Sequence, residues 1–71
     1  MMDIYPTVEK LIEHEMVVDE IRDEDINTLK AIGWQFALRW RHTEDKYSKE
    51  ANDLGATLMQ IKALVKAKRH L

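Results

Sequence analysis

The chain of 71 residues contains no cysteine, one proline and two glycines. The absence of cysteine excludes a disulfide framework and thiolate metal sites. So few turn-forming residues disfavour a fold of many short strands and favour a few long helices. The length suits one small domain, which we take as residues 1–71.

Long hydrophobic runs are also missing. The longest nearly apolar stretch, residues 31–38, is broken by Gln35 and falls well short of the roughly 20 residues that span a bilayer. The first residues lack the basic and then apolar pattern of a secretory signal. We therefore expect a soluble, cytoplasmic protein that makes no contact with a membrane.

A strong excess of one charge is absent overall, yet the charges are segregated along the chain. The formal net charge is −2. Residues 1–28 hold nine acidic and two basic side chains, which makes −7, whereas residues 29–71 hold nine basic and four acidic side chains, which makes +5. Such halves complement each other within one chain or across a dimer, or they present two faces to two kinds of partner.

Helical periodicity predicts three helices, over about residues 6–21, 24–41 and 44–69. Asp23 and Thr43 are the expected N-caps of the second and third helices, because short polar side chains there accept the first backbone N–H groups. The second helix is apolar on more than one side, which places it centrally. The apolar stripes of these two helices are Ile26, Leu29, Gly33, Phe36 and Trp40, and Tyr47, Ala51, Leu54, Leu58, Ile61 and Val65.

A single helix over residues 24–69 is the alternative to a break near residue 43. No glycine or proline lies between Trp34 and Ala51, and the apolar spacing continues through the junction. That helix would be about 70 Å long at 1.5 Å per residue and would bury its stripe only in a dimer. We favour the break, because Thr43 and the two acids after it are typical of a helix start.

These features predict an all-α fold, a three-helix bundle or helical hairpin that self-associates into a larger bundle. A short first helix interrupted by glutamates covers the apolar second and third helices poorly, so a homodimer would complete the core. Trp34, Leu38 and Met59 are the expected interface residues, because tryptophan is common in binding hot spots and methionine adapts to its contacts.

No pattern for catalysis or cofactor binding stands out, and we expect neither an enzyme, a cofactor nor a metal site. One spacing is suited to Mg²⁺, since Glu50 and Asp53 set two carboxylates on one helical face. It resembles the second half of the all-α nucleotide pyrophosphohydrolase signature, which implies a Mg²⁺-dependent nucleotide hydrolase. The Glu-Glu-x-x-Glu that those enzymes carry on an earlier helix has no counterpart here.

The function that we predict is a non-enzymatic interaction or regulatory module that binds another protein. Its expected contacts are an apolar helical face and the acidic first helix, with Glu9, Glu13 and Glu20. Carboxylates repeated along a helix suit a basic groove on a partner, because they resemble a row of phosphates.

A nucleic-acid-binding helical protein is the alternative function. Basic side chains neutralise phosphates, and the candidates in the second and third helices are Arg39, Arg41, Lys66 and Arg69. An isoelectric point near 5.9 is far from the basic balance of most small nucleic-acid-binding proteins. We therefore prefer a protein partner.

Overall fold

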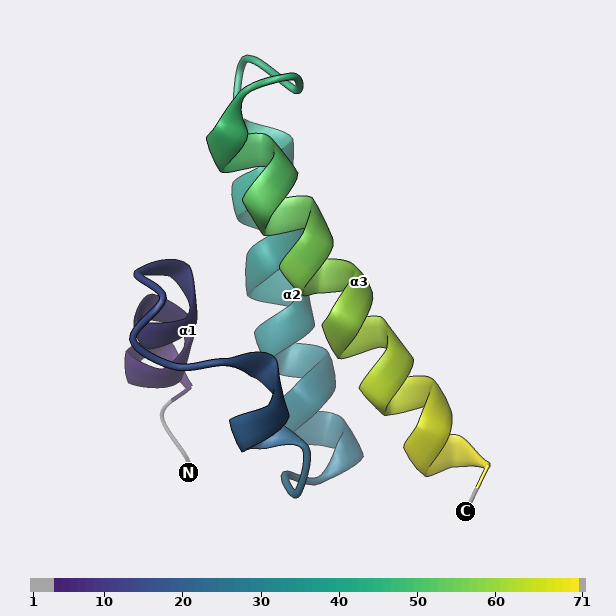
Figure 1. Ribbon diagram of the computed structural model, residues 1–71. Helices are drawn as coiled ribbons and strands as arrows, with labels where there is room; N and C mark the ends of the chain where they lie inside the picture. The colour runs from purple at the N-terminus through teal and green to yellow at the C-terminus, as the bar shows by residue number, and fades with distance from the viewer. Residues whose placement is uncertain (1–3, 71) are drawn as a thin grey trace.

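The computed structural model describes residues 4–70, which form helices joined by short turns (Figure 1). The elements are α1 (Tyr5–Ile12), the 3₁₀ helix η1 (Val18–Ile21), α2 (Ile26–His42) and α3 (Lys49–Arg69). The predicted all-α class is confirmed: α2 and α3 form a helical hairpin, and α1 and η1 pack against it. Within this described part, no helix is both long enough and apolar enough to cross a membrane.

The first helix ends after eight residues, so the predicted helix over 6–21 is wrong in its second half. His14 adopts the left-handed conformation, with a φ of 61°. The N–H of Glu15 donates to the Lys10 carbonyl at 2.8 Å, and the N–H of His14 donates to the Leu11 carbonyl at 3.3 Å. These two bonds form a Schellman C-cap, which satisfies the last carbonyls of α1 and turns the chain.

The connection from α1 to α2 is built by two acidic side chains. Glu20 accepts a hydrogen bond from the Val17 N–H at 2.8 Å and so closes the start of η1. Asp25, and not the predicted Asp23, is the N-cap of α2, because its Oδ1 accepts from the Thr28 N–H at 2.6 Å. This hydrogen bond lowers the pKa of the Asp25 carboxyl below its ordinary value, since it favours the charged form.

The chain breaks between α2 and α3, as predicted, but α3 begins later than residue 44 and the loop runs from Thr43 to Ser48. The Thr43 hydroxyl donates to the Arg39 carbonyl at 2.9 Å, so Thr43 closes the end of α2 instead of starting α3. Lys46 Nζ donates to carbonyls of the same helix end, among them that of Thr43 at 2.7 Å. Ser48 is the N-cap of α3, and its Oγ accepts from the Ala51 N–H at 3.1 Å.

The core lies where α1, η1, α2 and α3 meet. It contains Val8, Leu11, Val18, Ile21, Leu29, Ile32, Phe36, Leu54, Ile61 and Val65. The predicted central place of α2 is confirmed, since it packs against both α1 and α3. Gly33 allows α2 and α3 to approach closely, because a Cβ there would lie 3.3 Å from Ile61 Cγ2. Tyr47 departs from the predicted stripe: it precedes α3 and is 98% exposed.

Candidate functional site

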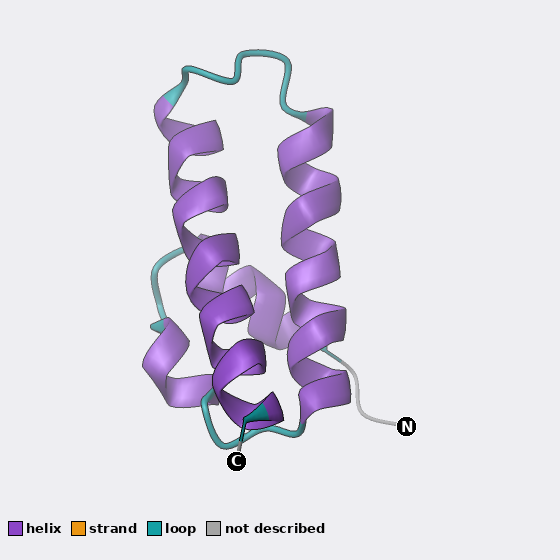
Figure 2. Cartoon of the chain, turned by 90° about the vertical axis from the view of Figure 1, so that its right-hand side faces the viewer, coloured by secondary structure: helices purple, strands orange, loops and turns teal. Residues whose placement is uncertain are grey.

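One face of the α2–α3 hairpin is left uncovered by the rest of the chain. The two long helices lie in front in Figure 2, and α1 lies behind them. Trp34 and Met59 line hollows of this uncovered side and are 56% and 66% exposed. We name this side the open face. Large apolar side chains gathered on one surface are typical of a contact with another molecule.

Between α2 and α3 the open face forms a groove with a volume of about 830 Å³, with Trp34 at its edge. We name it the cationic groove. Its floor is apolar and consists of Leu29, Gly33, Ala37, Leu58, Ile61 and Val65. Its rim is basic and consists of Lys30, Arg41, Lys62, Lys66, Arg69 and His70. No side-chain carboxylate of residues 4–70 lines this groove.

Helical spacing arranges the rim in two rows. On α3, Lys62, Lys66 and Arg69 are separated by four and three residues, which puts them on one side of the helix. On α2, Lys30 and Arg41 mark the two ends of the groove. They are separated by about 16 Å along the helix axis at 1.5 Å per residue. The groove therefore has the length of about three helical turns.

The open face continues from the cationic groove toward the α2–α3 loop. A second hollow of about 400 Å³ lies there, and Leu58 lines both hollows. Trp40 and Met59 line the second hollow, and Lys46 Nζ lies 4.3 Å from the centre of the Trp40 ring. This cation–π contact restrains the ring. Both tryptophans of the chain thus belong to the open face.

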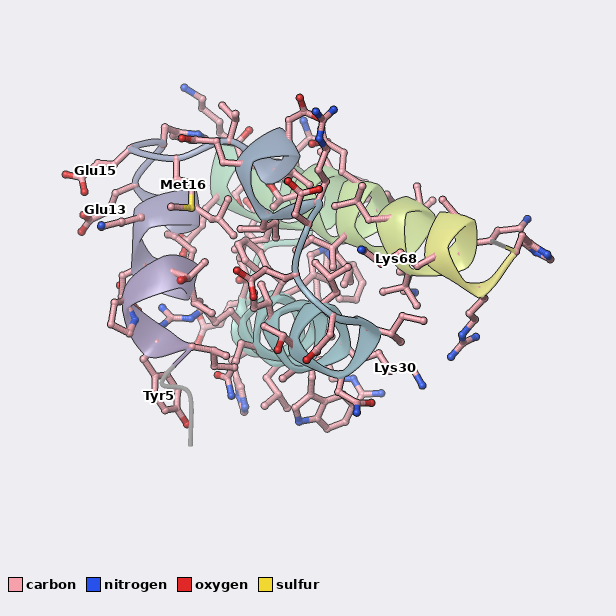
Figure 3. All side chains as sticks on the ribbon, turned by 90° about the horizontal axis from the view of Figure 1, so that it is seen from below. Tyr5, Glu13, Glu15, Met16, Lys30 and Lys68 are labelled. Carbon is pink, nitrogen blue, oxygen red and sulfur yellow. The ribbon has the colours of Figure 1, made fainter. Side chains whose placement is uncertain are left out.

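Two of the three predicted acidic contact residues are engaged inside the chain. Glu9 on α1 forms an ion pair with Arg39 on α2, and Glu20 accepts a backbone N–H at the start of η1. Glu13 is exposed just after α1, and Figure 3 shows that Glu13 and Glu15 both point outward. The acidic surface at this end of α1 therefore centres on Glu13 and Glu15.

The structure brings together most of the residues predicted to contact nucleic acid. Arg41, Lys66 and Arg69 all line the cationic groove. Arg39 is separate, because its ion pair holds it on the side of α2 that faces α1. Lys62 also lines the groove, and its spacing to Lys66 and Arg69 puts it in the same row of cations along α3.

The predicted dimer contacts do not form a single patch. Trp34 and Met59 belong to the open face, whereas Leu38 is half-buried and lines a hollow together with Ile12 of α1. Leu58, which the sequence placed in the seam of the third helix, is half-buried at the centre of the open face. The exposed apolar side chains of the open face are therefore Trp34, Trp40 and Met59, with Leu58 half-buried among them.

The predicted carboxylate pair lies where the turn after α1 meets α3. Glu50 and Asp53 line a hollow of about 290 Å³ together with His14. His14 Nε2 lies 3.8 Å from Asp53 Oδ2. Across residues 4–70, no three histidine, aspartate or glutamate side chains come close enough together to hold a metal ion. We build no metal site on these residues.

Comparisons with protein-family models, with curated proteins and with solved structures give no match for this chain. Function is therefore inferred from the open face itself. Its relevant properties are an apolar floor, a basic rim and two exposed tryptophans.

Proposed function

We propose that this chain is a non-enzymatic protein-interaction module that binds its partner on the open face of the α2–α3 hairpin. The observation that carries the proposal is the exposed pair Trp34 and Met59 beside an apolar-floored groove of about 830 Å³. Apolar surface gains free energy when a partner removes it from water. A groove between two helices is a surface onto which a helix of another protein packs.

The binding energy is expected to concentrate on few residues. Trp34 combines a large apolar ring with an exposed position at the edge of the groove, which is the profile of a hot spot. Met59 and Leu58 extend the same surface toward the loop. Glu13 and Glu15 project on the side of α1, away from the open face, and are not part of this contact surface.

Site-specific crosslinking tests this proposal. A photoreactive side chain replaces Met59 in one variant and Val17 in another. Val17 is a matched control, because it is 60% exposed and lines a hollow on the side of α3 that η1 approaches. We expect a protein adduct from position 59 and a much weaker one from position 17. Equal adducts from both positions would contradict binding on the open face.

The captured protein is then purified, and its affinity is measured for the original chain and for Trp34→Ala. Truncating a hot-spot tryptophan costs about 2 kcal/mol or more, so we expect a dissociation constant at least about 30-fold higher. Val17→Ala serves as the control and leaves the affinity unchanged. An affinity that Trp34→Ala does not alter would refute the assignment of the open face.

Nucleic acid is the second candidate partner, and one observation favours it: Arg41, Lys66 and Arg69 lie together on the cationic groove. Titration of a labelled oligonucleotide at several salt concentrations tests this possibility. Phosphate binding falls steeply with salt, and losing one phosphate contact lowers the slope of log K against log[salt] by about 1. Arg41→Ala and Lys66→Ala would each show that decrease. The apolar floor argues for the protein partner.

A further inference from the structure

We infer that the cationic groove binds an acidic amphipathic helix presented by another protein. This inference rests on the proposed function, because it assumes that the open face is the binding surface. It adds the chemical class of the partner: a helix with one apolar stripe and with carboxylates along both edges of that stripe.

The floor of the groove fits the apolar stripe of such a helix. Two antiparallel helices leave a furrow between them, and a third helix that lies in it buries its apolar face against both. On the other side of the hairpin, α1 crosses behind the two long helices and η1 lies beside α3, and both bury apolar side chains against the hairpin. On the open face, Leu58 remains half-buried and Trp34 exposed, so a third helix would cover them.

The rim fits the charges of such a helix. Lys30 and Arg41 lie on the α2 edge, and Lys62, Lys66 and Arg69 lie on the α3 edge. Glutamates spaced three or four residues apart on both edges of the partner would meet cations on either side. The rim spans about three helical turns, so about 11 residues of the partner would lie in the groove.

The same charges disfavour the two other occupants. A second copy that packed its open face on this one about a two-fold axis would set Lys62 and Lys66 against the same cations of its partner, which costs free energy. A nucleic acid would meet the rim but would leave the exposed Trp34 and the half-buried Leu58 without a complementary apolar surface.

Two synthetic peptides of about 14 residues test the inference. Both carry leucine and alanine on one helical face; one carries glutamate along both edges of that face, and the other carries lysine at the same positions. Binding is followed by tryptophan fluorescence, because both tryptophans of the chain lie on the open face, and by calorimetry. We expect the glutamate peptide to shift the emission to the blue and to bind at least 10-fold more tightly than the lysine peptide.

Charge reversal of the rim provides the second readout. In the variant Lys62→Glu with Arg69→Glu, we expect the glutamate peptide to bind at least 10-fold more weakly and the lysine peptide to bind more tightly. The control variant carries Lys10→Glu and Arg22→Glu, two exposed bases outside the groove that change the net charge equally. It should keep the original preference. All four positions are exposed, and circular dichroism checks that the helices are retained.

The outcomes separate the partner class from the proposed function. A preference for the glutamate peptide that inverts in the rim variant supports the inference. Equal binding of both peptides, or tighter binding of an oligonucleotide than of either peptide, overturns it. So does a chain that dimerises at low salt and excludes both peptides. If neither peptide binds but crosslinking from position 59 still captures a partner, the assignment of a helical partner is overturned and the proposed function stands. If that crosslinking also fails, the proposed function is overturned as well.

Discussion

Single residues decide where the helices of this protein end, and His14 is the clearest case. Its φ of 61° lies in the left-handed region, where a side chain with a Cβ is disfavoured. The Schellman cap of α1 nevertheless requires that conformation at this position. Glycine usually occupies it, because glycine adopts a positive φ without steric cost.

His14→Gly is therefore expected to stabilise the protein by about 0.5–1 kcal/mol, since relief of the left-handed strain exceeds the entropy cost of glycine. His14→Ala keeps the strain and should not stabilise. The contact with Asp53 is solvent-exposed and adds little. Urea unfolding of the three proteins measures the difference. A glycine variant no more stable than the alanine variant would show that the positive φ is not a cost.

Asp25 gives the stability of the molecule an acid-dependent component. Its pKa is lowered in the folded protein chiefly by the hydrogen bond from the Thr28 N–H, whereas an unfolded aspartate titrates at about 3.9. The contribution is thus complete above the unfolded pKa and is lost as the pH falls through the lower, folded pKa. In Asp25→Asn, the cap acceptor remains but the titration is removed.

We therefore expect the stability of the original chain to fall more steeply between pH 5 and pH 2 than that of Asp25→Asn. Urea unfolding midpoints measured at several pH values give both slopes. Glu13→Gln, which removes an exposed carboxylate after α1, is the matched control. Parallel curves for all three proteins would contradict a special role of Asp25.

At the scale of elements, the α2–α3 hairpin determines the shape of the groove, and its two glycines differ in role. At Gly33 a Cβ would lie 3.3 Å from Ile61 Cγ2, which is a tight contact between the helices. Ile61 is buried and branched at Cβ, so it has little freedom to move aside. At Gly55 the nearest atom would be Trp40 Nε1 at 3.7 Å, which is an ordinary contact.

Gly55→Ala is accordingly expected to raise the free energy of unfolding by about 0.5–1 kcal/mol, because alanine favours the helix. Gly33→Ala should raise the free energy of unfolding by less, because the tight contact of its Cβ with Ile61 offsets part of the gain in helix propensity. Chemical denaturation of both variants tests the comparison. Equal gains would mean that α2 and α3 do not approach closely at Gly33.

At the scale of the whole molecule, the acidic end of α1 and the cationic groove lie on different sides. Figure 3 shows Glu13 and Glu15 projecting on the side of α1, whereas Lys30 projects on the far side, from α2. The acidic first half of the chain therefore does not cover the cationic groove. Self-association, which the sequence predicts, is a proposal. Because the groove is cationic, the salt dependence of a dimer would reveal which surfaces form its interface.

A homodimer that forms through two open faces should weaken as the salt concentration falls, because its two cationic rims repel each other. Salt screens this repulsion: the screening length is about 3 Å at 1 M salt and about 30 Å at 0.01 M. We expect mainly the 8.4 kDa monomer at low salt and a larger share of dimer at high salt. Light scattering on a sizing column measures both. A dimer favoured at low salt would instead place the acidic side of one copy in the groove of another.

The candidate site was only partly predictable from the sequence. The sequence marks Trp34 and Met59 as apolar residues outside the stripes and predicts a protein contact for them. It marks Arg41, Lys66 and Arg69 as cations and predicts a nucleic-acid contact for these three. Helical spacing alone does not tell which side of a hairpin its neighbours cover. The packing of α1 and η1 against one side is what joins these residues into one groove.

The sequence by itself determined the helical class, the central position of α2 and the buried stripe of α3, because apolar periodicity and the scarcity of glycine and proline act locally. It favoured, but did not determine, the break between α2 and α3, because the apolar spacing continues through the junction. Local competition between neighbouring hydrogen-bond partners set the caps, which helical spacing does not reveal: Thr43 closes α2, Ser48 starts α3, and His14 ends α1 in a conformation usually given to glycine. The tertiary structure decided which side of the hairpin α1 and η1 cover, and so which apolar and basic residues share the groove, because contacts between segments distant in sequence are not encoded in the spacing along one helix.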